Sequence, residues 1–369
     1  MASPWDRVEG PRFSVLPSRR RVTLRPIHSG LSYWSDYFNP DGPAPRPGYS
    51  TGWIAERLYG ILAERGTVDY WDYSQRPLGN AADVFVGHFW AFANVVRDNE
   101  FGRRIAVYVL SDPVRAVATL REAAERYGVP FPDWDLPPHE FDHEATMELA
   151  DAVMLVGNAT TLTTFDARWR SKITLVNYAP GFSSWPHSST AGRRREFVYS
   201  ATTCGLRKGF LDVIDTWREV PASETQLHVV GRIDEPYRER LAASRARAVT
   251  TYGWIPSSST RYHELLSSCR YAYIPTWVEG QMGTVLEVIA AGCVPITTRA
   301  SGVDDHVLEH CVIVEPGQPE QHRDSIHAML AWSETEYRER QAALSECMQR
   351  FHTWSGFDER VRKVVWSDN

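Results

Sequence analysis

Two series of short apolar segments alternating with helical segments constrain the fold of this chain more than any other feature. In the first series, Thr51–Arg65 has the apolar spacing of an amphipathic helix, and a strand over Arg21–Ile27 is broken by His28-Ser29-Gly30. The further apolar runs are Asp83–Val86, Arg104–Leu110, Ala152–Val156 and Ile173–Val176. Near-continuous apolar strands separated by helices predict a parallel sheet covered on both faces.

The second series begins after Ser183–Arg195, a stretch rich in Ser, Pro, Gly and Arg that we predict to be a linker. Its run Arg193-Arg194-Arg195 is expected to be a solvated loop. Strands are predicted at Phe197–Ser200, Gln226–Val230, Val249–Tyr252, Tyr271–Pro275, Val294–Thr297 and Val312–Val314. Helices are predicted at Phe210–Trp217, Arg261–Ser267 and Thr284–Ala291.

The length of 369 residues exceeds what one core usually organises, so the two series predict two doubly wound α/β domains. We expect the first over residues 1–190, irregular over 1–20, and the second over 191–352. Ligands of such sheets bind beyond the carboxyl ends of the strands, so two facing sheets predict an interdomain cleft.

Composition excludes several classes of protein. Hydrophobic residues at 43% and charged residues at 23% are ordinary for a globular chain, and the net charge of -6 argues against nucleic-acid binding. Five scattered cysteines without metal-ligand spacing predict free thiols in a reducing compartment and no metal site. No apolar stretch approaches the roughly 20 residues of a membrane span, and the amino-terminal residues lack a signal-peptide core. The expected location is the cytoplasm.

The stretch Tyr271–Pro295 carries the chemistry. A strand leads into a loop with Glu279, Gly280 and Gly283, and then into a short helix that includes Thr284 and Glu287 and ends at Gly292. Loop glycines let backbone approach a ligand, and the free N–H groups of a helix start attract phosphate. A carboxylate one turn inside the helix suits a ribose diol, and Glu279 suits the hydroxyls of a second sugar.

Glu279 and Glu287, with seven residues between them, resemble the Glu-x7-Glu signature of retaining GT-B glycosyltransferases, especially glycosyltransferase family 4. The surrounding Glu-Gly-x2-Gly-Thr-Val-Leu-Glu-x4-Gly-Cys-x-Pro makes the resemblance specific. Other stretches similar to the family follow in the required order: Asp83–His88, Leu175–Gly181, Val198–Phe210, Leu227–Arg232, Thr251–Ile255, Ala300–Val307 and Phe351–Trp354. The resemblance implies a GT-B fold, two Rossmann-like domains with a last helix, residues 353–369, returning to the first domain.

The resemblance also implies roles. A metal-independent enzyme of this type, which needs no cofactor, stabilises the leaving diphosphate with protein cations, here Lys208 first and Arg207 second. Thr202-Thr203-Cys204 stands where the family has a Gly-Arg pair, so Arg207 or Arg232 is expected to supply the second cation. Catalytic positions are Glu279, Lys208 and His88. Donor-binding positions are Glu287, Arg207, Gly280, Gly283, Thr284, Gly231 and Arg232.

On the acceptor side, Ser29, Gly30 and Asp112 are expected at strand ends that line the cleft, together with the loop Tyr33–Tyr49. The implied reaction is retaining transfer from a nucleotide sugar, with UDP or GDP as the expected nucleotide, to a hydroxyl of a glycan, a small molecule or a lipid-linked acceptor. Two alternatives are a nucleotide-sugar 2-epimerase of the same fold and a sugar-nucleotide-binding protein without transferase activity.

Overall fold

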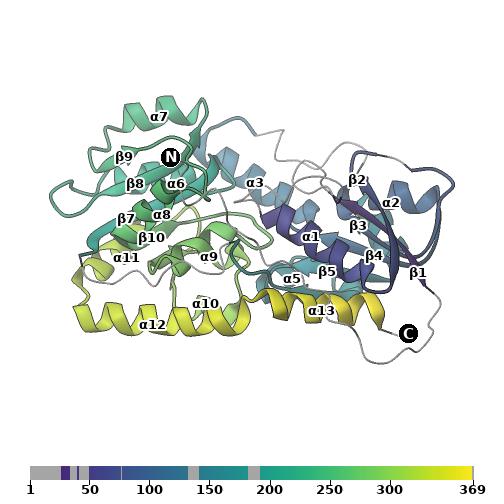
Figure 1. The fold of residues 1–369 in the computed structure, drawn as a ribbon. Coiled ribbons are helices and arrows are strands. Elements are labelled where there is room, and N and C mark those ends of the chain that lie inside the picture. Colours follow the sequence, from purple (N-terminus) through teal and green to yellow (C-terminus); the bar gives the residue numbers. More distant parts are fainter. Residues whose placement is uncertain are drawn as a thin grey trace, which may run out of the picture.

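The computed structural model describes residues 26–33, 40, 50–75, 77–131, 141–181 and 192–367. These residues form two α/β domains side by side, each built on its own sheet (Figure 1). Most of the expected strand Arg21–Ile27, most of the loop Tyr33–Tyr49 and most of the linker Ser183–Arg195 lie outside the described residues. The α/β fold with two doubly wound domains is confirmed.

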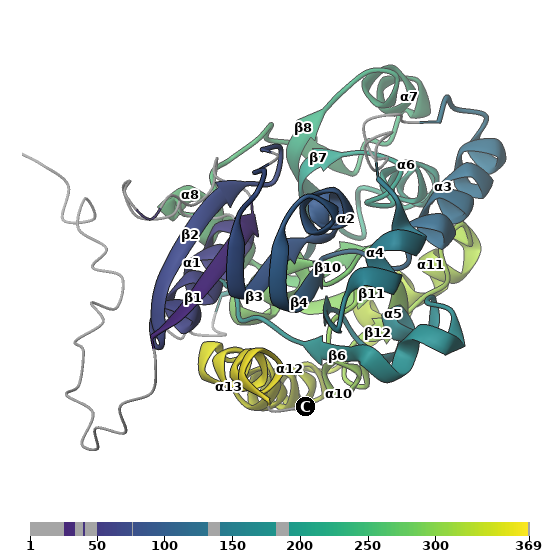
Figure 2. The same cartoon turned by 90° about the vertical axis from the view of Figure 1, so that its right-hand side faces the viewer.

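The first sheet has six parallel strands in the order β2-β1-β3-β4-β5-β6. In Figure 2, strands β2, β1, β3 and β4 follow one another across it. The strands are β1 (Ile27–Tyr33), β2 (Gly66–Asp72), β3 (Ala81–His88), β4 (Glu100–Tyr108), β5 (Ala152–Val156) and β6 (Ile173–Val176). The helices are α1 (Ser50–Ala63), α2 (Phe89–Arg97), α3 (Pro113–Tyr127), α4 (His143–Leu149) and α5 (Ala159–Thr163). Strand β2 has no counterpart in the sequence-based expectation.

The position of the first strand corrects the sequence analysis. His28, Ser29 and Gly30 do not break a strand but lie inside β1, where Ser29 pairs with both Val68 and Val84. A β-carbon on Gly30 would lie 2.7 Å from the Trp71 ring, so the glycine makes room for that ring. Packing against a neighbouring strand, rather than local propensity, therefore decides this part of the strand.

The second sheet also has six parallel strands, in the order β12-β11-β10-β7-β8-β9. They are β7 (Arg194–Cys204), β8 (Leu227–Ile233), β9 (Val249–Thr251), β10 (Cys269–Ile274), β11 (Val294–Thr297) and β12 (Val312–Ile313). The helices are α6 (Phe210–Trp217), α7 (Tyr237–Ser244), α8 (Thr260–Ser268), α9 (Gly283–Ala290), α10 (Asp305–Leu308), α11 (Pro319–Ala331) and α12 (Glu334–Phe351). All six strands predicted for this half are present.

The arginine run Arg193-Arg194-Arg195 leads into β7 and is not a solvated loop, which corrects a second expectation. Arg193 is buried, and its guanidinium donates to the carbonyls of Cys269 at 3.2 Å and Ala291 at 2.5 Å. Arg195 is exposed and donates to the carbonyl of Trp332 at 2.9 Å. These arginines satisfy carbonyls at element ends, which otherwise stay unpaired.

The chain ends on the domain in which it began. Helix α12 runs along the second domain, and α13 (Trp354–Trp366) continues beneath the first (Figure 1). Asp358 on α13 accepts from Arg57 of α1 at 2.9 Å, and Arg103 of β4 donates to the carbonyl of Val364 at 2.9 Å. The predicted return of the last helix is confirmed.

Each sheet has a switch point, where the chain leaves neighbouring strands in opposite directions. In the second sheet it lies between β7 and β10, which pair directly while β8 and β9 continue on one side and β11 and β12 on the other. In the first sheet it lies between β1 and β3. Ligands of open parallel sheets bind at such points, so the loops after these four strands are where a site is expected.

Candidate active site

Three charged side chains meet at the switch point of the second sheet. Lys208 and Arg207 follow β7, and Glu279 follows β10. The Lys208 ammonium contacts Glu279 Oε1, and Arg207 Nη1 lies 3.3 Å from Oε2. The Glu279 side chain is 7% exposed, against 19% for Lys208 and 29% for Arg207, so the cations lie on the more accessible side. The structure therefore brings together three residues that the sequence analysis had assigned to one site.

Backbone contacts hold the Arg207-Lys208 turn in place. The Arg207 carbonyl accepts from Trp277 N–H at 2.9 Å, and the Lys208 carbonyl accepts from the Tyr199 hydroxyl at 3.1 Å. The next residue, Gly209, has φ +70°, and a β-carbon there would lie 1.9 Å from the Pro275 carbonyl oxygen. Only glycine suits both conditions. The turn after β7 is thus locked against the loop after β10, which aims both cations at Glu279.

Glu287 lies on α9, behind the loop. Its carboxylate accepts a hydrogen bond of 2.7 Å from the Tyr262 hydroxyl. Burial raises the pKa of Glu287 to about 6, and the bond from Tyr262 opposes that rise. No described side chain caps the amino end of α9, where Gly283 and Thr284 lie. Uncapped first-turn N–H groups are suited to an anion.

Gly231 and Arg232 lie at the end of β8, next to β7. A β-carbon on Gly231 would lie 2.3 Å from the Ala201 carbonyl oxygen, so this glycine serves the approach of the two strands. Arg232 is exposed and is held by Asp234, at 3.1 Å, and by Thr203 Oγ1, at 3.0 Å. Of the two candidates for the second cation, Arg207 contacts Glu279, whereas the hydrogen bonds of Arg232 go to Asp234 and Thr203.

The loop after β10 packs directly against the first domain. A β-carbon on Gly280 would lie 2.3 Å from the Val109 carbonyl oxygen and 2.7 Å from that of Val156. The Glu279 carbonyl accepts from Ser111 N–H at 3.3 Å, and the Gln281 carbonyl accepts from the Tyr178 hydroxyl at 2.9 Å. Gly280 therefore allows the close contact that brings Glu279 to the carboxyl edge of the first sheet.

A second loop, residues 299–305, also joins the domains. Asn158 Nδ2 donates to the Val303 carbonyl at 2.9 Å, and Asn177 Nδ2 donates to Asp304 Oδ2 at 2.9 Å. Ala159 N–H, at the start of α5, donates to Asp305 at 3.1 Å. The sequence analysis assigned no role to Asn158, and its only local signal is its place as the helix cap of α5.

His88 ends β3 at the switch point of the first sheet. It pairs in register with Val107, two residues before the Val109 carbonyl that lies against Gly280. Its ring is fully buried beside Tyr33, at a centroid distance of 5.5 Å, and burial lowers the pKa of His88 to about 3. The imidazole is therefore neutral at physiological pH, able to donate one hydrogen bond and accept another.

Of the three predicted acceptor-side residues, Ser29 and Gly30 are placed differently from the expectation, whereas Asp112 lies after a strand as predicted. Ser29 and Gly30 lie three to four residues before the end of β1, so their predicted position at a strand end is wrong. Asp112 does follow β4, but its carboxylate caps α3 and lies 3.1 Å from His143 Nε2. Burial raises the pKa of Asp112, and the bonds from His143 and from the helix amides outweigh it and lower the pKa below its ordinary value. Asp112 is thus engaged in holding α3 and α4 together.

Comparison with known proteins shows what part of the chain resembles. Residues 194–331 match the family model described as glycosyl transferases group 1. The matched segment contains the turn after β7, the loop after β10 and helix α9. The second domain is therefore similar to glycosyl transferases of this group.

Solved structures similar to this chain share its fold at low sequence identity. The trehalose-phosphate synthase (UDP-forming) from Burkholderia vietnamiensis is 11% identical with a TM-score of 0.62, over 92% of this chain and 97% of that one. Sucrose-phosphate synthase from Thermosynechococcus elongatus is 14% identical with a TM-score of 0.60, over 92% and 98%. S. aureus TarM, in complex with alpha-GlcNAc-glycerol and UDP, is 11% identical with a TM-score of 0.56. The match covers 77% of this chain, which spans 55% of TarM. No curated protein matches.

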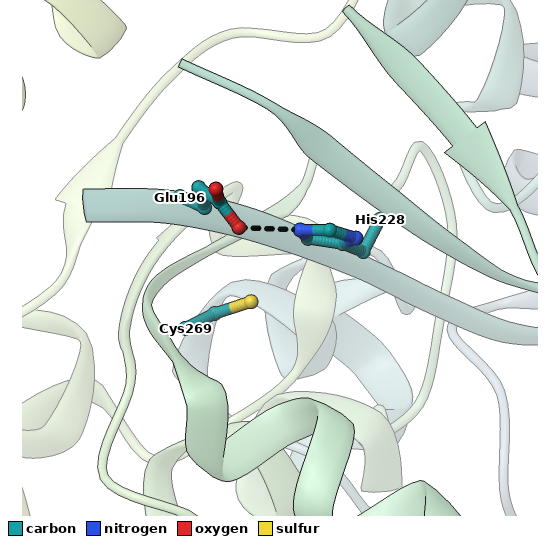
Figure 3. Close-up of side chains that lie close together, drawn as sticks. All are labelled: Glu196, His228 and Cys269. Atoms are coloured by element: carbon teal, nitrogen blue, oxygen red, sulfur yellow. Dashed lines mark hydrogen bonds and ion pairs between the residues drawn. The ribbon is translucent and has the colours of Figure 1, made fainter. Parts of the chain in front are cut away.

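One further cluster of side chains among the described residues has the composition of a metal site. Glu196, His228 and Cys269 offer ligand atoms within 4.8 Å of one another (Figure 3). They lie at the starts of β7, β8 and β10, at the edge of the sheet opposite the loop that follows β10. Glu196 Oε2 accepts from His228 Nε2 at 2.6 Å and from Arg194 at 2.9 Å, so a guanidinium already supplies the positive charge there. We interpret this cluster of side chains as a structural contact between neighbouring strands.

Two other observations concern a surface hollow and the character of the helices. A hollow of about 530 Å³ lies at the amino edge of the first sheet, lined by His28, Asp83, Asn99 and Arg104 among others, away from the switch point. None of the helices in the described ranges combines the length and apolar character needed to cross a membrane.

Proposed function

We propose that this enzyme is a retaining, metal-independent glycosyltransferase of family 4 type that takes its sugar from a nucleoside diphosphate, with UDP as the expected nucleotide. The observation that carries the proposal is the contact of Lys208 and Arg207 with Glu279 beside the uncapped start of α9. Two cations and first-turn N–H groups suit a diphosphate, and Glu279 suits the hydroxyls of the sugar next to it.

The roles follow from this arrangement. Lys208 and Arg207 neutralise the charge that develops on the leaving phosphate, which is the task a metal ion performs in other transferases. Glu287, one turn into α9, accepts from the ribose diol. The acceptor hydroxyl attacks the anomeric carbon on the face from which the diphosphate leaves, and its proton passes to the leaving phosphate oxygen. Positioning and charge stabilisation therefore replace a covalent nucleophile.

The nucleotide is proposed on two grounds. The fold neighbours include a UDP-forming synthase and a TarM structure that holds UDP. The carboxylate of Glu287 favours a ribonucleotide over a deoxyribonucleotide, because it needs a diol. His88, neutral and at the carboxyl edge of the first sheet, is proposed to contact a hydroxyl of the donor sugar or of the acceptor.

A thermal-shift screen against UDP, GDP, ADP and dTDP tests the donor, because a ligand stabilises the fold that binds it. We expect UDP to give the largest shift. The second step measures release of free nucleotide from the matching sugar nucleotide, with and without candidate acceptors. Glu279→Ala is expected to abolish release while the melting temperature stays near that of wild type. Glu320 is an exposed residue on α11, and Glu320→Ala serves as the control.

Full activity of Glu279→Ala would overturn the assignment. A C2-epimerised sugar nucleotide formed without an acceptor would favour an epimerase instead. Binding without any turnover would leave a sugar-nucleotide-binding protein.

A further inference from the structure

The Glu287 carboxylate accepts a hydrogen bond from a buried tyrosine that lies outside both the loop after β10 and helix α9. Tyr262 lies on α8, is 2% exposed, and places its hydroxyl 2.7 Å from Glu287 Oε2. The same hydroxyl lies 3.0 Å from Ser200 Oγ on β7. The three side chains form a line from the central strand of the second sheet, through α8, to the carboxylate on α9.

The direction of both hydrogen bonds follows from the groups involved. An ionised carboxylate only accepts, so the single phenolic proton of Tyr262 goes to Glu287. Ser200 must then donate its hydroxyl proton to the Tyr262 oxygen. Burial, with Glu287 nearby, raises the pKa of Tyr262 well above its ordinary value, so the phenol keeps its proton and remains a donor.

The bond restrains a side chain that is otherwise mobile. A glutamate has three rotatable bonds, and fixing them costs free energy when a ligand binds. A buried partner that fixes the carboxylate beforehand removes part of that cost from binding. Each carboxylate oxygen has two lone pairs, so Glu287 can accept from Tyr262 and still accept two further bonds from a ligand.

We propose that Tyr262, supported by Ser200, is a positioning residue that orients the Glu287 carboxylate toward the ribose diol of the donor. This inference rests on the proposed function, since it requires that Glu287 binds a ribonucleotide. It goes further by assigning discrimination between ribose and deoxyribose to a residue outside the loop and helix that contact the donor.

The test compares the nucleoside diphosphate found in the screen, UDP in the expected case, with its 2′-deoxy form, by titration calorimetry. In Tyr262→Phe we expect affinity for the ribonucleotide to fall about tenfold, the scale of one hydrogen bond to a charged group. Affinity for the deoxy form should change less than twofold. The transfer reaction should show the loss in donor KM, with kcat little changed.

Tyr337→Phe is the matched control. Its hydroxyl is also buried and donates to the Gly292 carbonyl at 2.9 Å, just beyond the carboxyl end of α9. This variant loses a buried bond to the same stretch of chain without touching Glu287, so the ratio of the two affinities should stay at the wild-type value. If Tyr262→Phe does not fold, Ser200→Ala removes the support one step further back and should lower the ratio about threefold.

Equal weakening of both nucleotides in Tyr262→Phe, or an unchanged ratio, would overturn the inference. So would additive losses in Tyr262→Phe combined with Glu287→Gln, because a residue that acts through Glu287 has little left to lose without the carboxylate. If Glu287→Gln abolishes the preference of the wild-type protein for the ribonucleotide over its 2′-deoxy form, and Tyr262→Phe keeps that preference, this inference is wrong while the proposed function stands. Absence of binding by every nucleotide in the screen defeats the proposed function, and this inference with it.

Discussion

The two switch points of the molecule carry side chains of different kinds. After β7 and β10 in the second sheet lie two cations and a carboxylate in mutual contact. At the ends of β1 and β3 in the first sheet lie Tyr33 and His88, whose buried rings pack edge to face, and burial keeps His88 neutral. The first arrangement suits the charged diphosphate, whereas the second suits hydroxyls and rings. Under the proposed function, charge stabilisation belongs to the second domain and contacts with the acceptor belong to the first.

The two switch points also differ in how strictly their surroundings determine which residue can occupy each position. The charged turn is enclosed by backbone contacts that leave little choice of residue, such as Gly209 against the Pro275 carbonyl. The aromatic side rests on side-chain packing, in which rings of similar volume replace one another more easily. We therefore expect changes in the second domain to alter the rate and changes in the first to alter the choice of acceptor.

The largest effect is expected from Lys208→Ala, which removes a cation from the charged switch point. Loss of one preorganised group that stabilises developing charge lowers kcat about 10²–10³-fold. Lys363 is an exposed residue on α13, so Lys363→Ala is the control and should leave kcat at the wild-type value. Steady-state nucleotide release measures both. A decrease in kcat of less than threefold in Lys208→Ala would contradict this contrast, because the charged switch point of the second sheet would then not carry the chemistry.

Gly280→Ala tests the contact between the two switch points. The added methyl would overlap the Val109 and Val156 carbonyl oxygens, so the domains must separate by a fraction of an ångström or more. Such displacement of reacting groups costs up to about 10²-fold in rate, whereas nucleotide binding within the second domain should change only a few-fold. Calorimetry and transfer rates measure the two quantities separately.

Gly60→Ala is the control for that substitution. Gly60 lies in α1 with open space around its missing β-carbon, so the change should raise stability by about 0.5–1 kcal/mol and leave the rate unaltered. A rate for Gly280→Ala equal to that of Gly60→Ala would mean that domain contact at this point is unimportant for transfer.

A smaller effect is expected from pH, and it distinguishes the two sides. Glu287 accepts from a diol when ionised, and burial raises its pKa to about 6, so donor affinity should fall as pH drops through 6, about tenfold by pH 5. Tyr262 of α8 and Tyr178 after β6 face this region, and burial raises the pKa of both phenols, so neither titrates there. His88, with a pKa near 3, adds no titration between pH 5 and 8.

The measurement uses the intact sugar nucleotide, whose phosphates keep constant charge over that range. Glu287→Gln should remove the acid limb, and Tyr262→Phe should move it to higher pH because a bond that favours the ionised form is lost. A limb that persists in Glu287→Gln would assign the titration to another group.

The donor side was predictable from sequence because its signals are local. A strand, a glycine-containing loop and a helix follow one another within 25 residues from Tyr271 to Pro295, and the structure places them as expected. Lys208 lies 71 residues from Glu279, yet the order of strands in a doubly wound sheet brings the ends of β7 and β10 together. The roles of these residues remain predictions until the variants are measured.

The errors arose where tertiary packing decides. Polar His28 and Ser29 beside Gly30 look like a strand break, but the Trp71 ring of the neighbouring strand needs the space above Gly30. The arginines at the start of β7 look solvated, but Arg193 donates to the carbonyls of Cys269, which begins β10, and Ala291, which follows α9. Asn158 gives no sign in sequence that it binds a loop about 145 residues further on. Each depends on a distant partner that no local pattern reveals.

The return of the chain to its first domain has a mechanical consequence. The polypeptide passes between the domains twice, once after β6 and once between α12 and α13. Two bodies joined at two separate points resist twisting and sliding, and the motion left most free is rotation about the line through those points. Separation of the two domains would then be a rotation about this single axis, and loss of either connection would free the remaining motions.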